Sequence, residues 1–439
     1  MTTGLQSLKD TFVKRAKGGS IRRFSLSMSA AVLGRLSLLA LSILVARSLG
    51  ATDYGAFTFA TGLALVLGQF AGLGWPTLMN RLIPGFKKDG DWSSMRGLLR
   101  AGPAIILTAS LVFSSVLVIV SYRVGELRLS FILSALLTPP FAFCILRRQQ
   151  LAALKKAHFG MLLDQGFGAL VTVGLLLILG GLTLGETVVA YAIATLGGTM
   201  IGASLVRKFS PVEVFAAKAT YRLAPWMATA FPIMIGLSAK LLLGKTDVLL
   251  LAPLAGLEAS GIYGAAWRLT YILTFPQVVL MTLVTPALSE AFTSGQAARA
   301  RRIVFLSLGF TTLTTAPFIV AFFVFGPQII GLIFGPGFEN ATVPLQILSL
   351  GQLAVSFSMV FASVLMMGGR ERLFAGWNVI LLAINIAACL ILIPSLGPIG
   401  AAIAMAGTAG LLLLGQAALA WQLVLRRPIG QLKAQYNVE

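Results

Sequence analysis

Ionisable side chains inside long apolar stretches are the residues of this sequence whose chemistry needs explanation. Arg35 lies near the middle of the first apolar stretch and Lys240 near the middle of the seventh. Lys245, Asp247 and Arg268 lie farther along the seventh stretch and in the eighth. A charged group at the centre of a bilayer costs at least about 2.5 kcal/mol, so each is a candidate functional residue.

Cations outnumber acids in this set, and the excess predicts an anionic ligand. Arg offers two parallel donors to a phosphate, and Lys offers a compact point charge. If the anion crosses the membrane as part of a larger molecule, the head group of a lipid diphosphate is the expected ligand. We therefore assign Arg35 and Lys240 to binding of this diphosphate.

Two acids are candidates for a charge-partner or ion-coupling role. Asp247 shares a helix face with Lys240 and is expected to pair either with it or with Arg268. Asp164 lies at the inner end of the fifth stretch, where it acts either in coupling or as a cap at the membrane interface. Lys245 is expected to reach the interface with its long side chain.

Polar and aromatic residues within the stretches are candidate glycan contacts, although residues of these types also pack helices together. They are Gln69, Trp267, Tyr271, Gln277 and Asn378.

Composition indicates an all-α integral membrane protein. Of the 439 residues, 57% are hydrophobic and 11% charged, whereas a soluble domain carries about 25% charged residues. Apolar stretches of about 20 residues, the length that spans a bilayer, recur along the chain. We predict about twelve spans, near 26–46, 56–75, 101–120, 129–146, 161–182, 188–206, 226–252, 260–286, 304–324, 343–367, 375–393 and 398–424.

The formal charge of +20 is explained by Lys and Arg residues in the segments that connect the spans, so it does not require nucleic acid as a partner. Most Lys and Arg residues fall in alternate connecting segments, and the opposite loops hold only Arg47, Arg123 and Arg128. Cytoplasmic loops collect Lys and Arg, so this asymmetry predicts an inner-membrane protein with both termini in the cytoplasm. Residues 1–24 are expected to form an amphipathic segment on the membrane surface rather than a signal peptide.

The chain contains an internal repeat. At a shift of 206 residues, Gly50 meets Gly256, Gly55 meets Gly261, and Arg35 falls one position from Lys240. Glycine permits a tight reversal between spans. We expect two six-helix bundles related by a pseudo-twofold axis, with the cations of the two halves meeting in one central cavity. The predicted divisions are a first bundle at 25–208, a linker at 209–225, a second bundle at 226–425 and a tail at 426–439.

Few residues suit catalysis or metal binding. The two cysteines, Cys144 and Cys389, lie in apolar stretches, and His158 is the only histidine. No paired carboxylates, Ser-His set or phosphate-binding glycine loop is visible. We expect a non-enzyme without metal or cofactor. A membrane polymerase or ligase acting on lipid-linked sugars is the alternative from a different class.

Two short units resemble a known family. Residues Leu44–Gly50 with Asp53–Phe57, and Lys245–Leu251 with Gly261–Leu269, are similar to the Wzx-type flippases of the multidrug/oligosaccharidyl-lipid/polysaccharide exporter superfamily. The resemblance implies a V-shaped transporter that carries an undecaprenyl-diphosphate oligosaccharide for O-antigen, capsule or exopolysaccharide synthesis. By position, Arg35 matches the diphosphate-binding role that the resemblance implies for the first helix, and we extend this role to Lys240 and Arg268.

The resemblance also sets the expected partners and the main competing function. Partners are the lipid-linked oligosaccharide and membrane lipids, with a polysaccharide polymerase and glycosyltransferases as further candidates and a monomer as the expected state. Coupling to Na⁺ or H⁺ stays open. The competing function is small-molecule export of the MATE type, which carries mostly cationic substrates and so needs carboxylates where this sequence has Arg35.

Overall fold

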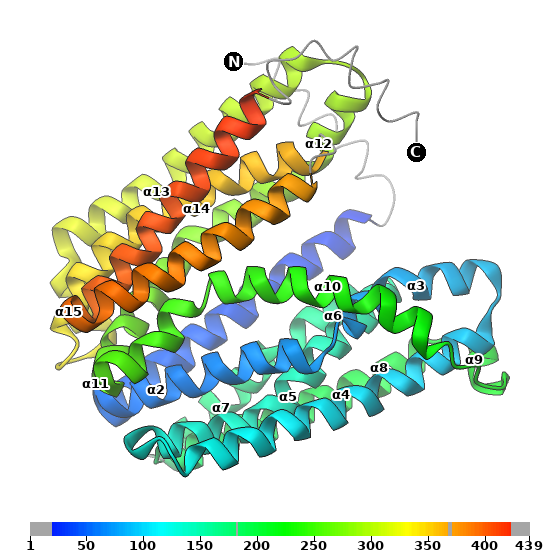
Figure 1. Cartoon of the computed structure of the whole chain (residues 1–439), viewed down its shortest axis with the longest axis horizontal. Helices are drawn as coiled ribbons and strands as arrows, with labels where there is room; N and C mark the ends of the chain where they lie inside the picture. The colour runs from blue at the N-terminus through cyan, green and yellow to red at the C-terminus, as the bar shows by residue number, and fades with distance from the viewer. Residues whose placement is uncertain (1–19, 181–182, 368–370, 423–439) are drawn as a thin grey trace. The chain divides into compact units, whose positions relative to one another are not determined.

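The structure is a computed structural model that describes residues 20–180, 183–367 and 371–422. Within these ranges the regular structure is helical and contains no strand (Figure 1). Most of the predicted surface segment at 1–24, and the whole tail at 426–439, lie outside the described residues. The helices are α2 (Ser20–Ala71), α3 (Trp75–Asp89), α4 (Trp92–Ser121), η1 (Gly125–Leu127), α5 (Arg128–Ala153), α6 (Ala157–Leu162), α7 (Gln165–Leu179), α8 (Leu184–Phe209), α9 (Val212–Ala216), α10 (Leu223–Leu243), α11 (Thr246–Thr270), η2 (Tyr271–Thr274), α12 (Phe275–Thr293), α13 (Ala297–Phe334), η3 (Glu339–Ala341), α14 (Thr342–Met367) and α15 (Glu371–Ala420).

Nine apolar helical segments in the described part of the chain are long enough to cross a membrane. Three of them, Leu26–Ala71, Thr246–Thr293 and Gly376–Ala420, are 45 to 48 residues long. Each of these is about twice the length that one crossing needs. With the shorter apolar helix Gly166–Leu179, the pattern agrees with the predicted all-α membrane fold of about twelve spans.

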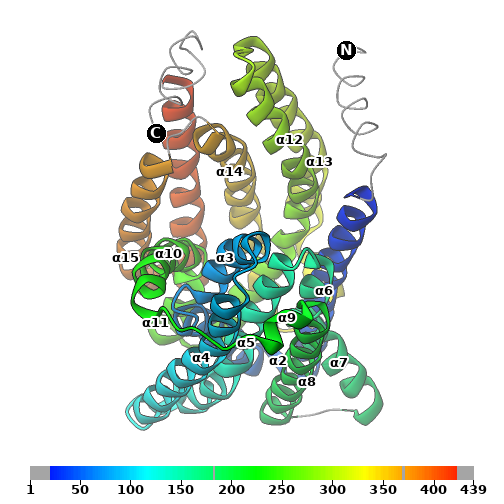
Figure 2. The ribbon, with the colours of Figure 1, turned by 90° about the vertical axis from the view of Figure 1, so that its right-hand side faces the viewer.

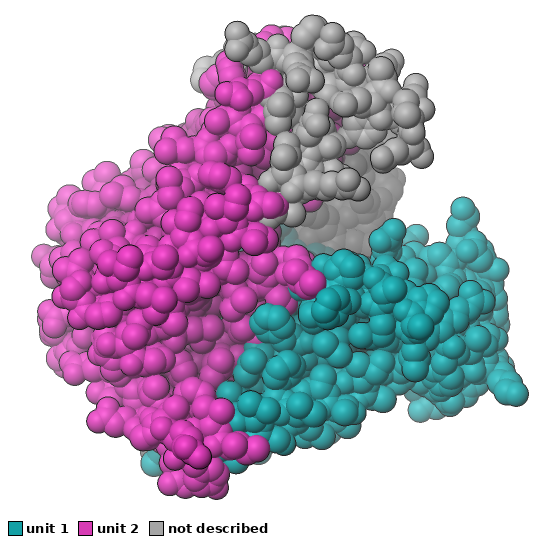
Figure 3. Space-filling model, viewed as in Figure 1, with its two compact units in different colours: residues 1–41, 67–118, 135–234 teal, residues 42–66, 119–134, 235–439 magenta. Residues whose placement is uncertain are grey.

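The described residues form two compact units, each built from separated parts of the chain (Figure 3). Both α2 and α10 contribute residues to each unit. The bundles at 25–208 and 226–425 were assigned from the internal repeat of the sequence, and this division stays a prediction. The first unit contains the described residues up to Leu41, Leu67–Val118 and Ala135–Met234, and the second contains Ser42–Val66, Ile119–Ser134 and the described residues from Ile235.

The core of the first unit includes the beginning of α10. Trp75 and Trp226 pack edge to face with ring centroids 5.9 Å apart. The indole Nε1 of Trp75 donates to the sulfur of Met227 at 3.0 Å. Gly74 lies directly against the backbone of Ala230 and has a φ of +77°, so only glycine fits that position without strain.

The linker predicted at 209–225 is held against the beginning of α4. The backbone N–H of Thr220 donates to the carbonyl of Ser93 at 3.0 Å. Arg96 donates to the carbonyl of Ala217, and Gly97 packs on the backbone of Thr220. These contacts attach the segment before α10 to the first unit.

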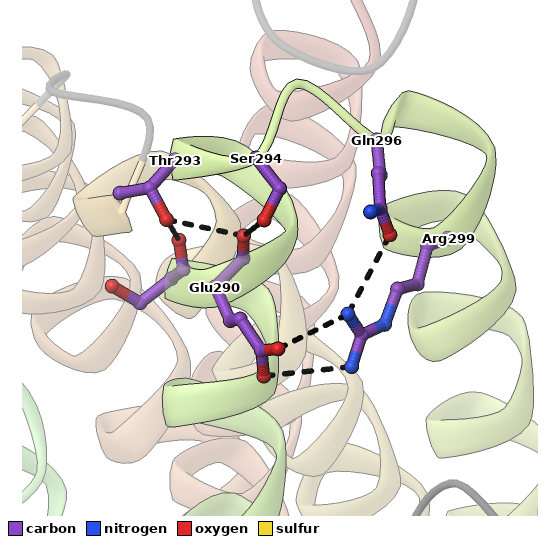
Figure 4. A network of polar contacts seen from close by, with 6 residues as sticks. Glu290, Thr293, Ser294, Gln296 and Arg299 are labelled. Atoms are coloured by element: carbon purple, nitrogen blue, oxygen red, sulfur yellow. Dashed lines mark hydrogen bonds and ion pairs between the residues drawn. The ribbon is translucent and has the colours of Figure 1, made fainter.

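In the second unit, α14 packs against α13 and α15, and α12 runs beside α13 (Figure 2). Glu290 and Arg299 form an ion pair of 3.3 Å across the turn between α12 and α13 (Figure 4). The hydroxyl groups of Thr293 and Ser294 donate to the carbonyl of Glu290 (Figure 4). The backbone N–H of Ser294 donates to the same carbonyl at 3.0 Å, so three donors converge on this oxygen at the end of α12.

Two glycines in equivalent positions of the repeat interrupt long helices in the same way. Gly50 breaks α2 with φ 79° and ψ −178°, and Gly256 breaks α11 with φ 89° and ψ 169°. This region of backbone space is essentially restricted to glycine. Gly50 and Gly256, which are equivalent in the repeat, therefore share one unusual backbone conformation.

The two halves of the repeat meet in the second unit through a reciprocal crossing. A Cβ on Gly55 would overlap the carbonyl of Leu257, and a Cβ on Gly261 would overlap that of Ala51. Positions 51 and 257, and positions 55 and 261, are equivalent at the shift of 206 residues. Reciprocal contacts of this kind are the mark of a twofold interface, so a local pseudo-twofold axis passes through this crossing.

Arg47 reinforces this region from one side. Its Nε donates to the carbonyl of Ile333 at 2.9 Å, and another guanidinium nitrogen donates to the carbonyl of Leu332. Both carbonyls belong to the last turn of α13, where a cation is favoured. Tyr54 packs nearby on Phe334 and Phe338, with centroids 6.1 and 5.9 Å from its own.

We expect Gly55→Ala and Gly261→Ala to destabilise the protein to a similar extent, because each methyl group would overlap backbone of the other half. Overpacking of this kind costs about 1–3 kcal/mol. Thermal unfolding of the purified protein in detergent measures the effect. Gly309→Ala on α13 is the control, because its added methyl meets no atom within 4 Å. Three equal unfolding midpoints would contradict the crossing.

Candidate functional site

The two cations assigned to the middles of equivalent helices belong to different compact units. Arg35 lies on α2 in the first unit and is half-buried. The neighbouring Gly34 packs against Gly166 of α7, and this close crossing fixes the helix turn that carries Arg35. Lys240 lies on α10 in the second unit and is exposed. Their convergence on one cavity stays a prediction.

Four sequence-identified side chains gather around α11 in the second unit. The Nζ of Lys245 lies 3.7 Å above the ring centroid of Trp267. The guanidinium carbon of Arg268 lies 5.9 Å from the ring centroid of Tyr271. The two rings meet edge to face at 4.5 Å. All four side chains are half-buried, so the cluster is partly open at its surface.

The break at Gly256 explains how these residues meet. Lys245 precedes Gly256 by the same number of positions by which Trp267 follows it. The chain reverses at this glycine and brings the two ends of α11 together. The ammonium group of Lys245 thus lies on an aromatic ring of the same helix, and its expected position at the membrane interface stays a prediction.

Asp247 lies deeper in the second unit and has a different partner from the ones expected. Its side chain is 2% exposed, and its Oδ2 accepts a hydrogen bond from the hydroxyl of Tyr263. In the described part of the chain it forms no ion pair with Lys240 or Arg268, so both expected pairings were wrong. Tyr263, which the sequence reading did not select, is the residue that meets the carboxylate.

The other oxygen of Asp247, Oδ1, is buried without a hydrogen-bond partner in the protein. A buried carboxylate oxygen without a partner is costly. Asp247 thus retains unused capacity to accept a proton or a cation.

Asp164 is an ion-paired residue of the first unit. Its Oδ2 lies 2.7 Å from an Nη of Arg148. It occupies the position before α7 but makes no side-chain capping hydrogen bond to that helix. The pair connects the end of α5 to the beginning of α7, and a coupling role for Asp164 stays a prediction.

The remaining candidate glycan contacts differ in their accessibility. Gln277 is 1% exposed; its amide donates to the Ser356 carbonyl at 2.8 Å and accepts from the Thr311 hydroxyl at 2.7 Å. Asn378 on α15 is buried, and Gln69 on α2 is half-buried. Gln277 therefore links α12 to α13 and α14, whereas Trp267, Tyr271 and Gln69 have accessible surface.

We expect Tyr263→Phe to destabilise the protein by about 1–3 kcal/mol, because it removes the donor that satisfies a buried carboxylate. Tyr221→Phe is the matched control, since Tyr221 is exposed. Thermal unfolding in detergent compares the two variants. Asp247→Asn in the Tyr263→Phe background should recover part of the loss by removing the buried charge, and a Tyr263→Phe protein as stable as wild type would contradict this account.

The fold is that of the transporters of the MOP superfamily. An inward-facing MATE family multidrug resistance transporter of this superfamily superposes with a TM-score of 0.72, at 15% identity, over 93% of this chain and 98% of the other. The lipid II flippase MurJ, in an inward closed conformation, superposes with a TM-score of 0.70, at 15% identity, over 95% and 91%. At these identities the likeness defines the fold alone.

The polysaccharide biosynthesis protein family matches residues 21–292, which is more than half of the chain. The chain belongs to this family. The MatE family matches residues 232–391. The probable low-salt glycan biosynthesis flippase Agl15 of Haloferax volcanii is 30% identical over 147 residues. That match covers 33% of this chain and 31% of the relative, about a third of its length.

Proposed function

We propose that this protein is a flippase that moves an oligosaccharide linked to a polyprenyl diphosphate from the cytoplasmic to the outer leaflet by alternating access. The observation that carries the proposal is the excess of cations within the apolar helices. Arg35, Lys240, Lys245 and Arg268 are the four cations assigned to the apolar stretches. Among the described residues Asp247 is the buried acid, and it already accepts a hydrogen bond from Tyr263. An anionic substrate offsets the cost of these charges.

The proposed ligand follows from the chemistry of these side chains. Arg35 and Arg268 provide forked donors that suit phosphate oxygens, and Lys240 provides a mobile point charge. The accessible rings of Trp267 and Tyr271 are suited to sugar stacking, with Gln69 as a hydrogen-bonding group. Asn378 and Gln277 would join them only if α12–α15 rearranged, because both are buried here.

The membership of the polysaccharide biosynthesis family and the flippase name of the archaeal relative support this assignment. The proposed location is the cell inner membrane with both termini in the cytoplasm, as the Lys and Arg distribution predicts. A polysaccharide polymerase and glycosyltransferases are the proposed partners, and a monomer is the proposed state.

Coupling to Na⁺ or H⁺ is proposed to involve Asp247. Its buried Oδ1 has no partner in the protein, and binding of a cation or proton there would neutralise the carboxylate. Asp164 is the weaker candidate, because Arg148 already balances its charge.

Reconstituted proteoliposomes with a labelled undecaprenyl-diphosphate oligosaccharide test the proposal. We expect wild-type protein to move the lipid between leaflets. Arg35→Gln, Lys240→Gln and Arg268→Gln should each slow the movement about tenfold to a hundredfold, because a charge-assisted hydrogen bond contributes about 1.5–3 kcal/mol. Arg302→Gln, at an exposed position on α13, is the control. Absence of movement by wild type, with and without ion gradients, would contradict the proposal.

Export of small molecules is the second candidate function, favoured by the MatE match over residues 232–391. Such substrates are mostly cationic, and the intramembrane cations would repel them. Efflux of a cationic dye from proteoliposomes distinguishes the two functions: we expect no gradient-dependent efflux, and rapid efflux would favour export.

A further inference from the structure

The linker between the spanning helices α8 and α10 exposes large apolar side chains. Val212 is 80% exposed, Phe215 42% and Tyr221 53%. The first two lie on the short helix α9, which turns Val214 inward, where it is fully buried. A group of exposed apolar side chains marks a site of interaction with a membrane or with another protein.

Basic side chains lie beside these apolar ones. The guanidinium carbon of Arg207 lies 5.9 Å from the ring centroid of Phe215, which places a cation next to an exposed aromatic ring. Glu213 is the one acid of the segment 207–222, so the segment has a net charge of +3. The other exposed basic residues of the segment are Lys208, Lys218 and Arg222. Together, the exposed side chains of residues 207–222 form the linker surface.

Contacts with the first unit hold the linker surface in a fixed conformation. α9 lies at the end of this unit where α8 ends and α4 begins (Figure 1). The backbone of Thr220 is hydrogen-bonded to Ser93, and Arg96 donates to the carbonyl of Ala217. Because these contacts order the segment before it meets a ligand, little conformational entropy is lost on binding.

We propose that the linker surface binds the head groups of anionic phospholipids in the cytoplasmic leaflet. Val212 and Phe215 insert at the boundary between head groups and acyl chains, as the apolar face of an interfacial helix does. Arg207, Lys208 and Lys218 bind the lipid phosphates, because basic residues next to a membrane surface attract anionic lipids. The proposal does not depend on which molecule the protein transports.

Lipid fits this surface better than a soluble acidic protein does. The segment directly joins two spanning helices, Leu184–Phe209 and Leu223–Leu243, so both of its ends lie at a membrane surface. The distribution of Lys and Arg predicts that this surface is the cytoplasmic one, and the cytoplasmic leaflet carries anionic lipids. The charge and the apolar character of the linker surface therefore match the same occupant.

Fluorescence quenching in lipid nanodiscs tests the proposal on the full-length protein. Both cysteines of the sequence, Cys144 and Cys389, are buried, so a fluorophore attached to Val212→Cys reports on the linker surface alone. The quenchers are phosphatidylglycerol and phosphatidylcholine with nitroxide-labelled acyl chains, each mixed into unlabelled phosphatidylcholine. Gln296→Cys, at an exposed position in the polar turn between α12 and α13, is the control site.

We expect both lipids to quench the fluorophore at position 212, and phosphatidylglycerol to quench it more strongly. Neither lipid should quench the fluorophore at position 296 strongly. Quenching at position 212 as weak as that at position 296 would overturn the proposal, because it would show that the linker surface faces water, where a soluble partner binds.

The basic residues are tested in the Val212→Cys background. Lys208→Gln and Lys218→Gln should each lower the preference for phosphatidylglycerol over phosphatidylcholine by up to about fivefold, the contribution of one basic residue near an anionic membrane. Lys87→Gln should keep the preference and is the matched control, because Lys87 is exposed on α3, a helix without exposed large apolar side chains. Thermal unfolding of each variant checks that the protein is folded. Equal quenching by the two lipids, or a preference that neither Lys208→Gln nor Lys218→Gln lowers, would overturn the assignment to anionic lipid.

Discussion

Inside a bilayer, backbone N–H and C=O groups find hydrogen-bond partners only within the protein. This constraint makes the described chain helical from Ser20 to Ala420, apart from short connections and the gaps in the described ranges. It also restricts where the backbone changes direction. Gly50 and Gly256 adopt a conformation that other residues rarely reach, and each interrupts one long helix. The helix breaks thus occur where glycine permits them.

The same constraint explains how the halves of the repeat are joined in the second unit. Lipid tails are as apolar as leucine side chains, so helices associate through close packing more than through the hydrophobic effect. Gly55 and Gly261 allow the backbones to touch. The guanidinium of Arg47 adds hydrogen bonds to the last carbonyls of α13, which would otherwise lack partners.

Charged side chains inside a bilayer also need partners within the protein, and the described charges find them in different ways. Asp164 pairs with Arg148, Asp247 accepts from Tyr263, and Lys245 lies on Trp267. An ion pair needs no further ligand, whereas a cation on an aromatic ring keeps its charge available. This difference separates structural charges from those that suit a substrate, and it is why the cluster on α11 is the strongest candidate for recognition.

Composition and the spacing of apolar residues determined the membrane class, the helical fold and the repeat, because span length and the cost of buried charge depend only on local sequence. The charged candidates Arg268 and Asp247 followed from the same rule, whereas the partner of each side chain did not. Lys245 meets Trp267, and Tyr263 meets Asp247, only because the chain reverses at Gly256 and fixes the register between the two parts of α11. Such contacts depend on the angle and rotation of one helix against another, which tertiary packing alone decides.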